Sequence, residues 1–244
     1  MMPGSLRKCW VWLTVLPVLV SSIAQAQLTL DIDLSVNGTS VGHWTPSIVD
    51  TGSGYKIYDV TYNVPGSSLT FSNVTMATDP FISASVDVLN NTAGVQNYTL
   101  TYTLPIIAVV SPGSLLGGST QGGVTDANFN GTGILSTVGP GSALFFGQID
   151  GVNVLPLFSH LKTISAPFAG GSASDSTSAG LPGPTIPGAN PLLSIGIKHE
   201  FSLTAGDRAT FTSFFVVDPT PIPEPASLSL LAIGGLMVLC RRRR

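Results

Sequence analysis

The sequence predicts an all-β protein, either an antiparallel β-sandwich or a jelly roll, and three observations carry this prediction. Charged residues make up only 9% of the chain and hydrophobic residues 43%, whereas about a quarter of an average soluble domain is charged. Several short segments alternate apolar and polar side chains with a period of two, which is typical of strands with one buried face. No stretch between residues 27 and 220 sustains helical spacing, and Gly, Pro and Asn separate the alternating segments.

The strands can be placed by this alternation. The alternating segments are 28–36, 58–64, 82–88, 98–104 and 193–203, and 209–217 is β-branched and aromatic on both faces. The turn residues 90–94 connect the third and fourth segments, and Ala205, Gly206 and Asp207 connect the last two. We therefore expect 193–217 to form a hairpin, with a similar connection at 90–94.

Two stretches interrupt the strand pattern. Residues 111–142 contain nine glycines and one charged residue, and residues 165–191 consist mostly of Gly, Pro, Ser and Ala. A segment so poor in core-forming side chains predicts a flexible surface loop at 165–191. We keep it within one domain, because the hairpin predicted after it would not be stable alone.

The N-terminus has the parts of a secretory signal peptide. Arg7 and Lys8 are positive, residues 10–20 are apolar, and Ala24 and Ala26 form a small-residue cleavage site. The apolar run is short and contains a proline, so a membrane anchor is disfavoured. We expect signal peptidase to remove this segment.

The C-terminus has a different pattern. Pro223, Glu224 and Pro225 precede an uncharged stretch over 226–240. The chain then ends with Arg241, Arg242, Arg243 and Arg244. A helix of that length reaches about 22 Å, which is short of the roughly 30 Å hydrocarbon core of a bilayer. The pattern predicts a single short, weakly held transmembrane helix, with the arginines on the cytoplasmic side.

This tail resembles the PEP-CTERM sorting signal in all three of its parts: the Pro-Glu-Pro tripeptide, the apolar helix and the arginine cluster. The resemblance implies a Gram-negative bacterium and an exosortase that reads the signal in the inner membrane. It also implies removal of the tail and passage of the protein to the outer surface or extracellular matrix. Residues 79–105 and 201–217 resemble segments of other passengers of this class, which have no assigned activity.

The chain thus divides into a signal peptide over 1–26, a β-sandwich domain over 27–220 and a sorting signal over 221–244. Residues 27–220 hold twelve acids and four bases, a net charge of −8. So few basic residues argue against binding to nucleic acid, which needs Lys and Arg to neutralise phosphates. Both cysteines lie in the terminal segments, so the central domain can form no disulfide.

The sequence offers few candidates for catalysis. Asp50-Thr51-Gly52 resembles the aspartic-protease signature, but that chemistry needs two such aspartates and the chain holds one. A hairpin turn is the favoured interpretation. His43, His160 and His199 form no zinc or triad motif, and the strand pattern makes His199 a half-buried strand residue.

Two groups of oxygen-bearing residues suggest Ca²⁺. Asp31 and Asp33 share one face of a strand, and Asp126, Asn128 and Asn130 alternate in a Gly-rich loop. The second group resembles the start of a calcium loop, although no Glu occupies the closing position. Turns and solvated strand faces are favoured on motif grounds, so the sequence predicts neither a metal nor a cofactor.

These observations predict an exported, non-enzymatic protein of the cell surface or extracellular matrix. Its role would be structural or adhesive, in contact with exopolysaccharide in a biofilm. One alternative is a carbohydrate-binding module that uses aromatic residues such as Trp44, Tyr55, Tyr58 and Tyr62. The other alternative is a secreted hydrolase of the aspartic type, centred on Asp50.

Overall fold

The computed structural model describes residues 28–220 except 53, 78–79 and 107–112. Every regular element in this part of the chain is a strand, and every strand pair is antiparallel. The predicted all-β class with antiparallel sheets is confirmed. The predicted signal peptide and C-terminal helix lie outside the described residues.

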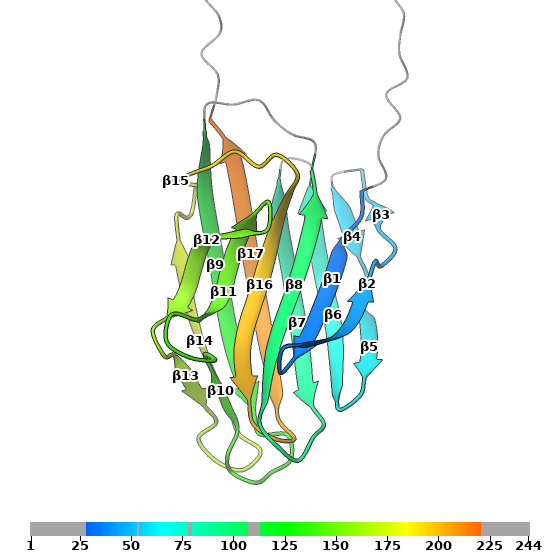
Figure 1. Ribbon diagram of the computed structural model, residues 1–244, viewed down its shortest axis with the longest axis vertical. Helices are drawn as coiled ribbons and strands as arrows, with labels where there is room; N and C mark the ends of the chain where they lie inside the picture. The colour runs from blue at the N-terminus through cyan, green and yellow to red at the C-terminus, as the bar shows by residue number, and fades with distance from the viewer. Residues whose placement is uncertain (1–27, 53, 78–79, 107–112, 221–244) are drawn as a thin grey trace, which may run out of the picture.

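The strands form two sheets that face each other, with sheet A in front of sheet B in Figure 1. Sheet A has the order β12-β11-β16-β8-β1-β2, and β10 pairs with β16 and β13. Its strands are β1 (Asp31–Val36), β2 (Thr39–Trp44), β8 (Gln96–Pro105), β10 (Ile134–Ser136), β11 (Ala143–Ile149), β12 (Val152–Ser159), β13 (Thr163–Ser165) and β16 (Ser194–Leu203).

Sheet B has the order β14-β9-β17-β7-β6-β4-β3, and β15 and β5 pair with β9 and β6 respectively. Its strands are β3 (Val49–Asp50), β4 (Tyr55–Ile57), β5 (Val60–Val64), β6 (Ser67–Ala77), β7 (Phe81–Asn90), β9 (Ser114–Thr125), β14 (Ser172–Ala179), β15 (Ile186–Gly188) and β17 (Arg208–Pro219). The long central strands of both sheets carry the period-two burial that the sequence predicts.

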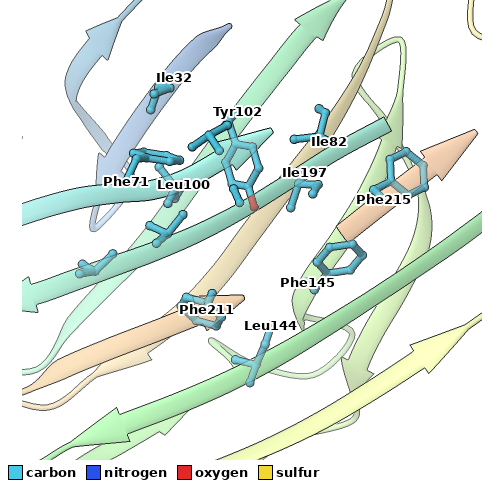
Figure 2. Close-up of a cluster of buried hydrophobic side chains, with 14 of the residues drawn as sticks. Ile32, Phe71, Ile82, Leu100, Tyr102, Leu144, Phe145, Ile197, Phe211 and Phe215 are labelled. Carbon is cyan, nitrogen blue, oxygen red and sulfur yellow. The ribbon is translucent and has the colours of Figure 1, made fainter. Parts of the chain in front are cut away.

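The hydrophobic core lies between the two sheets and is rich in aromatic rings (Figure 2). Tyr102 of sheet A meets Phe71 of sheet B edge to face, with ring centroids 5.5 Å apart. The ring of Phe215 packs so closely over Gly147 of the opposite sheet that a β-carbon there would lie 2.4 Å from it. Each fully buried side chain of this size contributes about 1.5–3 kcal/mol relative to its exposed state.

The structure corrects the two predicted connections. Strands β16 and β17 do not form a hairpin: β16 pairs with β8 and β11 in sheet A, whereas β17 pairs with β7 and β9 in sheet B. The β7–β8 connection likewise crosses from sheet B to sheet A. Both turns therefore bridge the sandwich, which lets the apolar faces of consecutive strands point at each other across the core.

Asn90 ties these two crossing turns together. Its side chain is fully buried, and its Nδ2 atom lies 3.1 Å from the carbonyl oxygen of Leu203 and 3.0 Å from that of Thr204. Its backbone N–H donates to Asp207 O at 2.9 Å, and its carbonyl accepts from Gly206 at 2.8 Å. The turns are therefore fixed to each other at one end of the molecule.

The two stretches that were predicted to lack strands contain them. Strand β9 lies within 111–142 and is a central strand of sheet B. Its glycines leave room for large neighbours: a β-carbon at Gly118 would lie 2.8 Å from the Leu155 side chain of the opposite sheet. Within the predicted loop at 165–191, β14 pairs with β9 along its whole length. Because β14 is an edge strand with almost no buried side chain, it has no apolar pattern to detect.

Candidate functional site

Asp50 lies in a short hairpin turn. It ends β3 opposite Tyr55 of β4, and its Oδ1 accepts a hydrogen bond from Gly52 N at 2.7 Å. Thr51 closes the same turn by donating from its N–H and from its hydroxyl group to Gly54 O, both at 2.9 Å. The Asp50 carboxylate is exposed and accepts a hydrogen bond within its own turn. The motif is therefore a hairpin turn, as the favoured interpretation predicts.

The three histidines differ in how deeply they are buried. His43 and His160 are exposed, and His43 Nδ1 lies 2.9 Å from Asp33 Oδ1. His199, predicted to be half-buried, is instead completely buried. The alternation had placed it correctly on the inner face of its strand, but sheet B covers it entirely.

His199 is the centre of a polar cluster inside the core. Its Nδ1 donates to Leu144 O at 2.8 Å, so its Nε2 is the acceptor, 3.2 Å from the Tyr102 hydroxyl and 3.3 Å from the Ser213 hydroxyl. The Ser213 hydroxyl lies 2.9 Å from that of Thr120. The cluster joins β8, β11 and β16 of sheet A to β9 and β17 of sheet B.

Electrostatics keep this cluster neutral. Burial lowers the pKa of His199 to about 4, although the bond to Leu144 O opposes the shift. Burial also raises the pKa of the Tyr102 hydroxyl above its usual range. Neutral, satisfied and sealed between two sheets, the cluster joins the sheets and does not face a substrate.

The aromatic residues proposed as a sugar platform are divided between the core edge and the surface. Trp44 and Tyr62 stack on each other, with ring centroids 4.4 Å apart and planes 19° apart, and both are partly buried. Tyr55 is also partly buried, whereas Tyr58 is 65% exposed. Of these four rings, Tyr58 is the one that offers most of its surface to a ligand.

The first pair of candidate calcium ligands, Asp31 and Asp33, contacts neighbouring side chains. Asp31 Oδ1 accepts from the Thr45 hydroxyl at 3.2 Å, and Asp33 Oδ1 contacts His43. The two carboxylates line a solvated strand face. This arrangement agrees with the favoured interpretation of that pair.

The second set has a partner that sequence reasoning missed. Asp126 begins the loop after β9 and is buried, and so is Asp207, in the turn between β16 and β17. The two carboxyl groups are close enough for each to affect the pKa of the other. In the described part of the chain, no group of three or more His, Cys, Asp and Glu side chains gathers in this way. Asp126 and Asp207 thus form a pair of buried carboxyl groups that belong to two different connections.

The outer face of sheet B carries a shallow hollow of about 370 Å³. It is lined by Ser119, Thr120, Gln121, Ser176, Thr177, Ser178 and Thr212. The hydroxyl group of Thr120 itself points into the core, where it lies beside Ser213. Charged side chains are absent from this lining. Such a surface offers hydrogen bonds to polar, uncharged ligands.

Comparison with known families identifies the C-terminal segment. Residues 221–244 match the family model of the PEP-CTERM protein-sorting motif. A search among curated proteins found no match to this chain. The predicted sorting signal is confirmed, and the motif implies processing by exosortase and export toward the cell envelope or surface.

The individual residues of the two terminal signals lie outside the described part of the chain. These are Ala24 and Ala26 of the signal-peptide cleavage site, Pro223, Glu224 and Pro225, and Arg241 to Arg244. Between residues 28 and 220, as far as they are described, no helix is long and apolar enough to cross a membrane.

Proposed function

We propose that this protein is an exported, non-enzymatic component of the cell surface or extracellular matrix. A signal peptide over 1–26 sends it across the inner membrane, and the tail holds it there briefly until exosortase processes it. Released, it acts as a structural or adhesive partner of exopolysaccharide in a biofilm. The observation that carries the proposal is the sorting motif at 221–244.

The described domain suits this role. A continuous core between two large sheets needs no disulfide, and its outer strands present Ser, Thr and Asn side chains with few charges. The hollow on sheet B adds hydroxyl groups that can bond to sugars. Many weak, uncharged contacts of this kind support adhesion or packing in a hydrated matrix.

The sorting step is tested by a substitution at the only glutamate of the tail. We expect Glu224→Gln to leave most of the protein as an unprocessed precursor in the inner membrane, because a charge between two rigid prolines is a distinctive recognition element. Mass spectrometry of fractionated cells would measure this. The released wild-type protein should begin near Gln27 and lack the four terminal arginines.

Glu200→Gln is the matched control, since it is the same exchange at the only other glutamate of the chain. Glu200 lies in β16 and pairs with Lys198 at 2.8 Å on the sheet surface. Its variant should be released like the wild type. Equal release of both variants would count against recognition of the Pro-Glu-Pro tripeptide.

The non-enzymatic role is tested on cells and on purified protein. Deletion should alter biofilm formation or aggregation and leave growth on simple media unchanged. The purified protein should show no turnover in a broad hydrolase screen that includes casein at acid pH. Turnover that disappears in Asp50→Asn would contradict the proposal and support the aspartic-type hydrolase.

A carbohydrate-binding module is the second candidate, favoured by exposed Tyr58 and by the hydroxyl-lined hollow of sheet B. A glycan array distinguishes it from a purely structural role. Defined glycan binding that is lost in Tyr58→Ala or Gln121→Ala would establish the module. Binding spread evenly over unrelated glycans would favour general adhesion.

A further inference from the structure

The loop that follows β9 and the turn between β16 and β17 are held together at the lower end of the molecule in Figure 1. Asn128 Nδ2 donates to Ala205 O at 2.6 Å. Ile134 N donates to the Thr204 hydroxyl at 2.7 Å, and Thr204 N donates to Ile134 O at 3.2 Å. The two segments therefore form one hydrogen-bonded unit, although they are distant in sequence.

Asp126 is held as a carboxylate at the start of this unit. Its Oδ1 accepts from Asn130 N at 3.2 Å, and its Oδ2 accepts from Gly131 N at 2.6 Å and Gly170 N at 3.2 Å. Burial by itself would raise the pKa of this group, but the backbone N–H donors outweigh it and lower the pKa below its usual range.

Asp207 completes the unit with a buried carboxyl group beside that of Asp126. Its side chain is fully buried and its Oδ2 accepts from the Thr204 hydroxyl, whereas its Oδ1 is buried and accepts no hydrogen bond. Burial raises the pKa of this carboxyl group, and the Thr204 hydroxyl and the Ala127 N–H oppose the shift. The adjacent Asp126 carboxyl group raises the pKa further, through its charge and through a hydrogen bond between the two side chains. Two buried carboxyl groups side by side are stable only if a proton or a cation lies between them.

The loop around Asp126 has the spacing of a calcium-binding loop. Oxygen-bearing side chains occupy its first, third and fifth positions, Asp126, Asn128 and Asn130, and the sixth is Gly131 with a φ of +79°. A calcium loop has this order, with a glycine at the sixth position for a sharp turn and an acidic residue at the twelfth. The twelfth position here is Thr137, so the closing carboxylate is absent from the loop itself.

We propose that Asp207 is this missing carboxylate and that Asp126, Asn128, Asn130 and Asp207 bind one Ca²⁺ ion. The donor set consists only of oxygens, which suits a hard cation of this size and disfavours zinc or copper. The ion lies between the two carboxylates and neutralises their repulsion. It thereby joins the β9–β10 loop to the β16–β17 turn.

The test is calcium titration of the full-length purified protein after treatment with a chelator. With only two carboxylates, we expect a dissociation constant of about 10⁻⁴–10⁻³ M, as in extracellular calcium modules. Calcium at about 100 times that constant should raise the melting temperature by roughly 5–10 °C, and equal magnesium should have a smaller effect. Isothermal titration calorimetry should give one site per chain.

Two substitutions separate a metal site from a structural contact. Asp207→Asn should abolish the calcium-dependent shift while leaving the calcium-free protein at least as stable, because it removes one of two repelling charges. Asn130→Asp adds a carboxylate and should tighten calcium binding several-fold, a gain that misfolding cannot produce. The matched control Asp59→Asn removes an exposed acid and should respond to calcium like the wild type.

Three results would overturn the proposal. The first is the absence of any saturable calcium effect on the wild type, which would mean that the carboxyl pair holds a proton instead. The second is a full calcium response in Asp207→Asn. The third is an Asn130→Asp variant that is destabilised and binds calcium no better than the wild type.

Discussion

Replacing His199 by alanine is expected to lower the free energy of unfolding by about 3–5 kcal/mol. The imidazole is fully buried and stacks on Phe211, with ring centroids 4.3 Å apart. Its removal leaves a cavity between the sheets, and it takes away the side-chain partner of Leu144 O and one partner of the Tyr102 hydroxyl. Both losses act together, which is why this effect is among the largest that one substitution can produce here.

Urea unfolding followed by circular dichroism measures the change. His43→Ala is the control, because His43 is exposed and its one side-chain partner, Asp33, is exposed as well. That variant should remain within about 1 kcal/mol of the wild type. Equal losses in the two variants would contradict the central role of the His199 cluster.

The alternation in the sequence predicted the strands well because each long strand has one face in a shared core. The inner face of β16 follows the predicted pattern from Ile195 to Leu203, whereas Leu193, the first residue of the predicted segment, precedes the strand and is 72% exposed. The sheet to which each strand belongs was not predictable in the same way. A hairpin and a crossing turn both need Gly, Asn and Asp, and the choice between them depends on distant partners such as β9 for β17.

The missed strands have physical causes as well. In β9, glycines replace the apolar side chains that would mark a strand, because side chains from neighbouring strands fill the space above them. In β14, the polar pattern reflects an edge position where no side chain is fully buried. Neither strand has the alternating apolar pattern by which a strand with one buried face is predicted.

Only part of the candidate calcium site can be predicted from the sequence. The spacing of Asp126, Asn128 and Asn130 raised the possibility, but the loop lacks a closing acid. Asp207 appeared only as a turn residue, because nothing local indicates that its turn crosses the sandwich and lies beside the other loop. The pairing of the two carboxylates is a consequence of topology, so it needed the structure.

Stability should fall by about 3 kcal/mol, from His199 alone, as the pH is lowered from 7 to 4. Burial lowers the folded-state pKa of this histidine to about 4, whereas an unfolded histidine titrates near 6.5. The unfolded chain therefore binds a proton first, and protonation draws the equilibrium toward unfolding. The contribution of His199 is complete above pH 6.5 and is lost progressively between 6.5 and 4.

Aspartates titrate at the lower end of this range, so the His199 contribution must be isolated by difference. Urea unfolding of the wild type and of His199→Gln at several values between pH 7.5 and pH 4 provides it. The variant should be less stable at neutral pH, and its loss on acidification should be smaller by about 3 kcal/mol because glutamine does not titrate. His43→Gln should keep the wild-type dependence. Parallel curves for the wild type and His199→Gln would show that the buried imidazole titrates normally, which its position between Leu144, Tyr102 and Ser213 makes unfavourable.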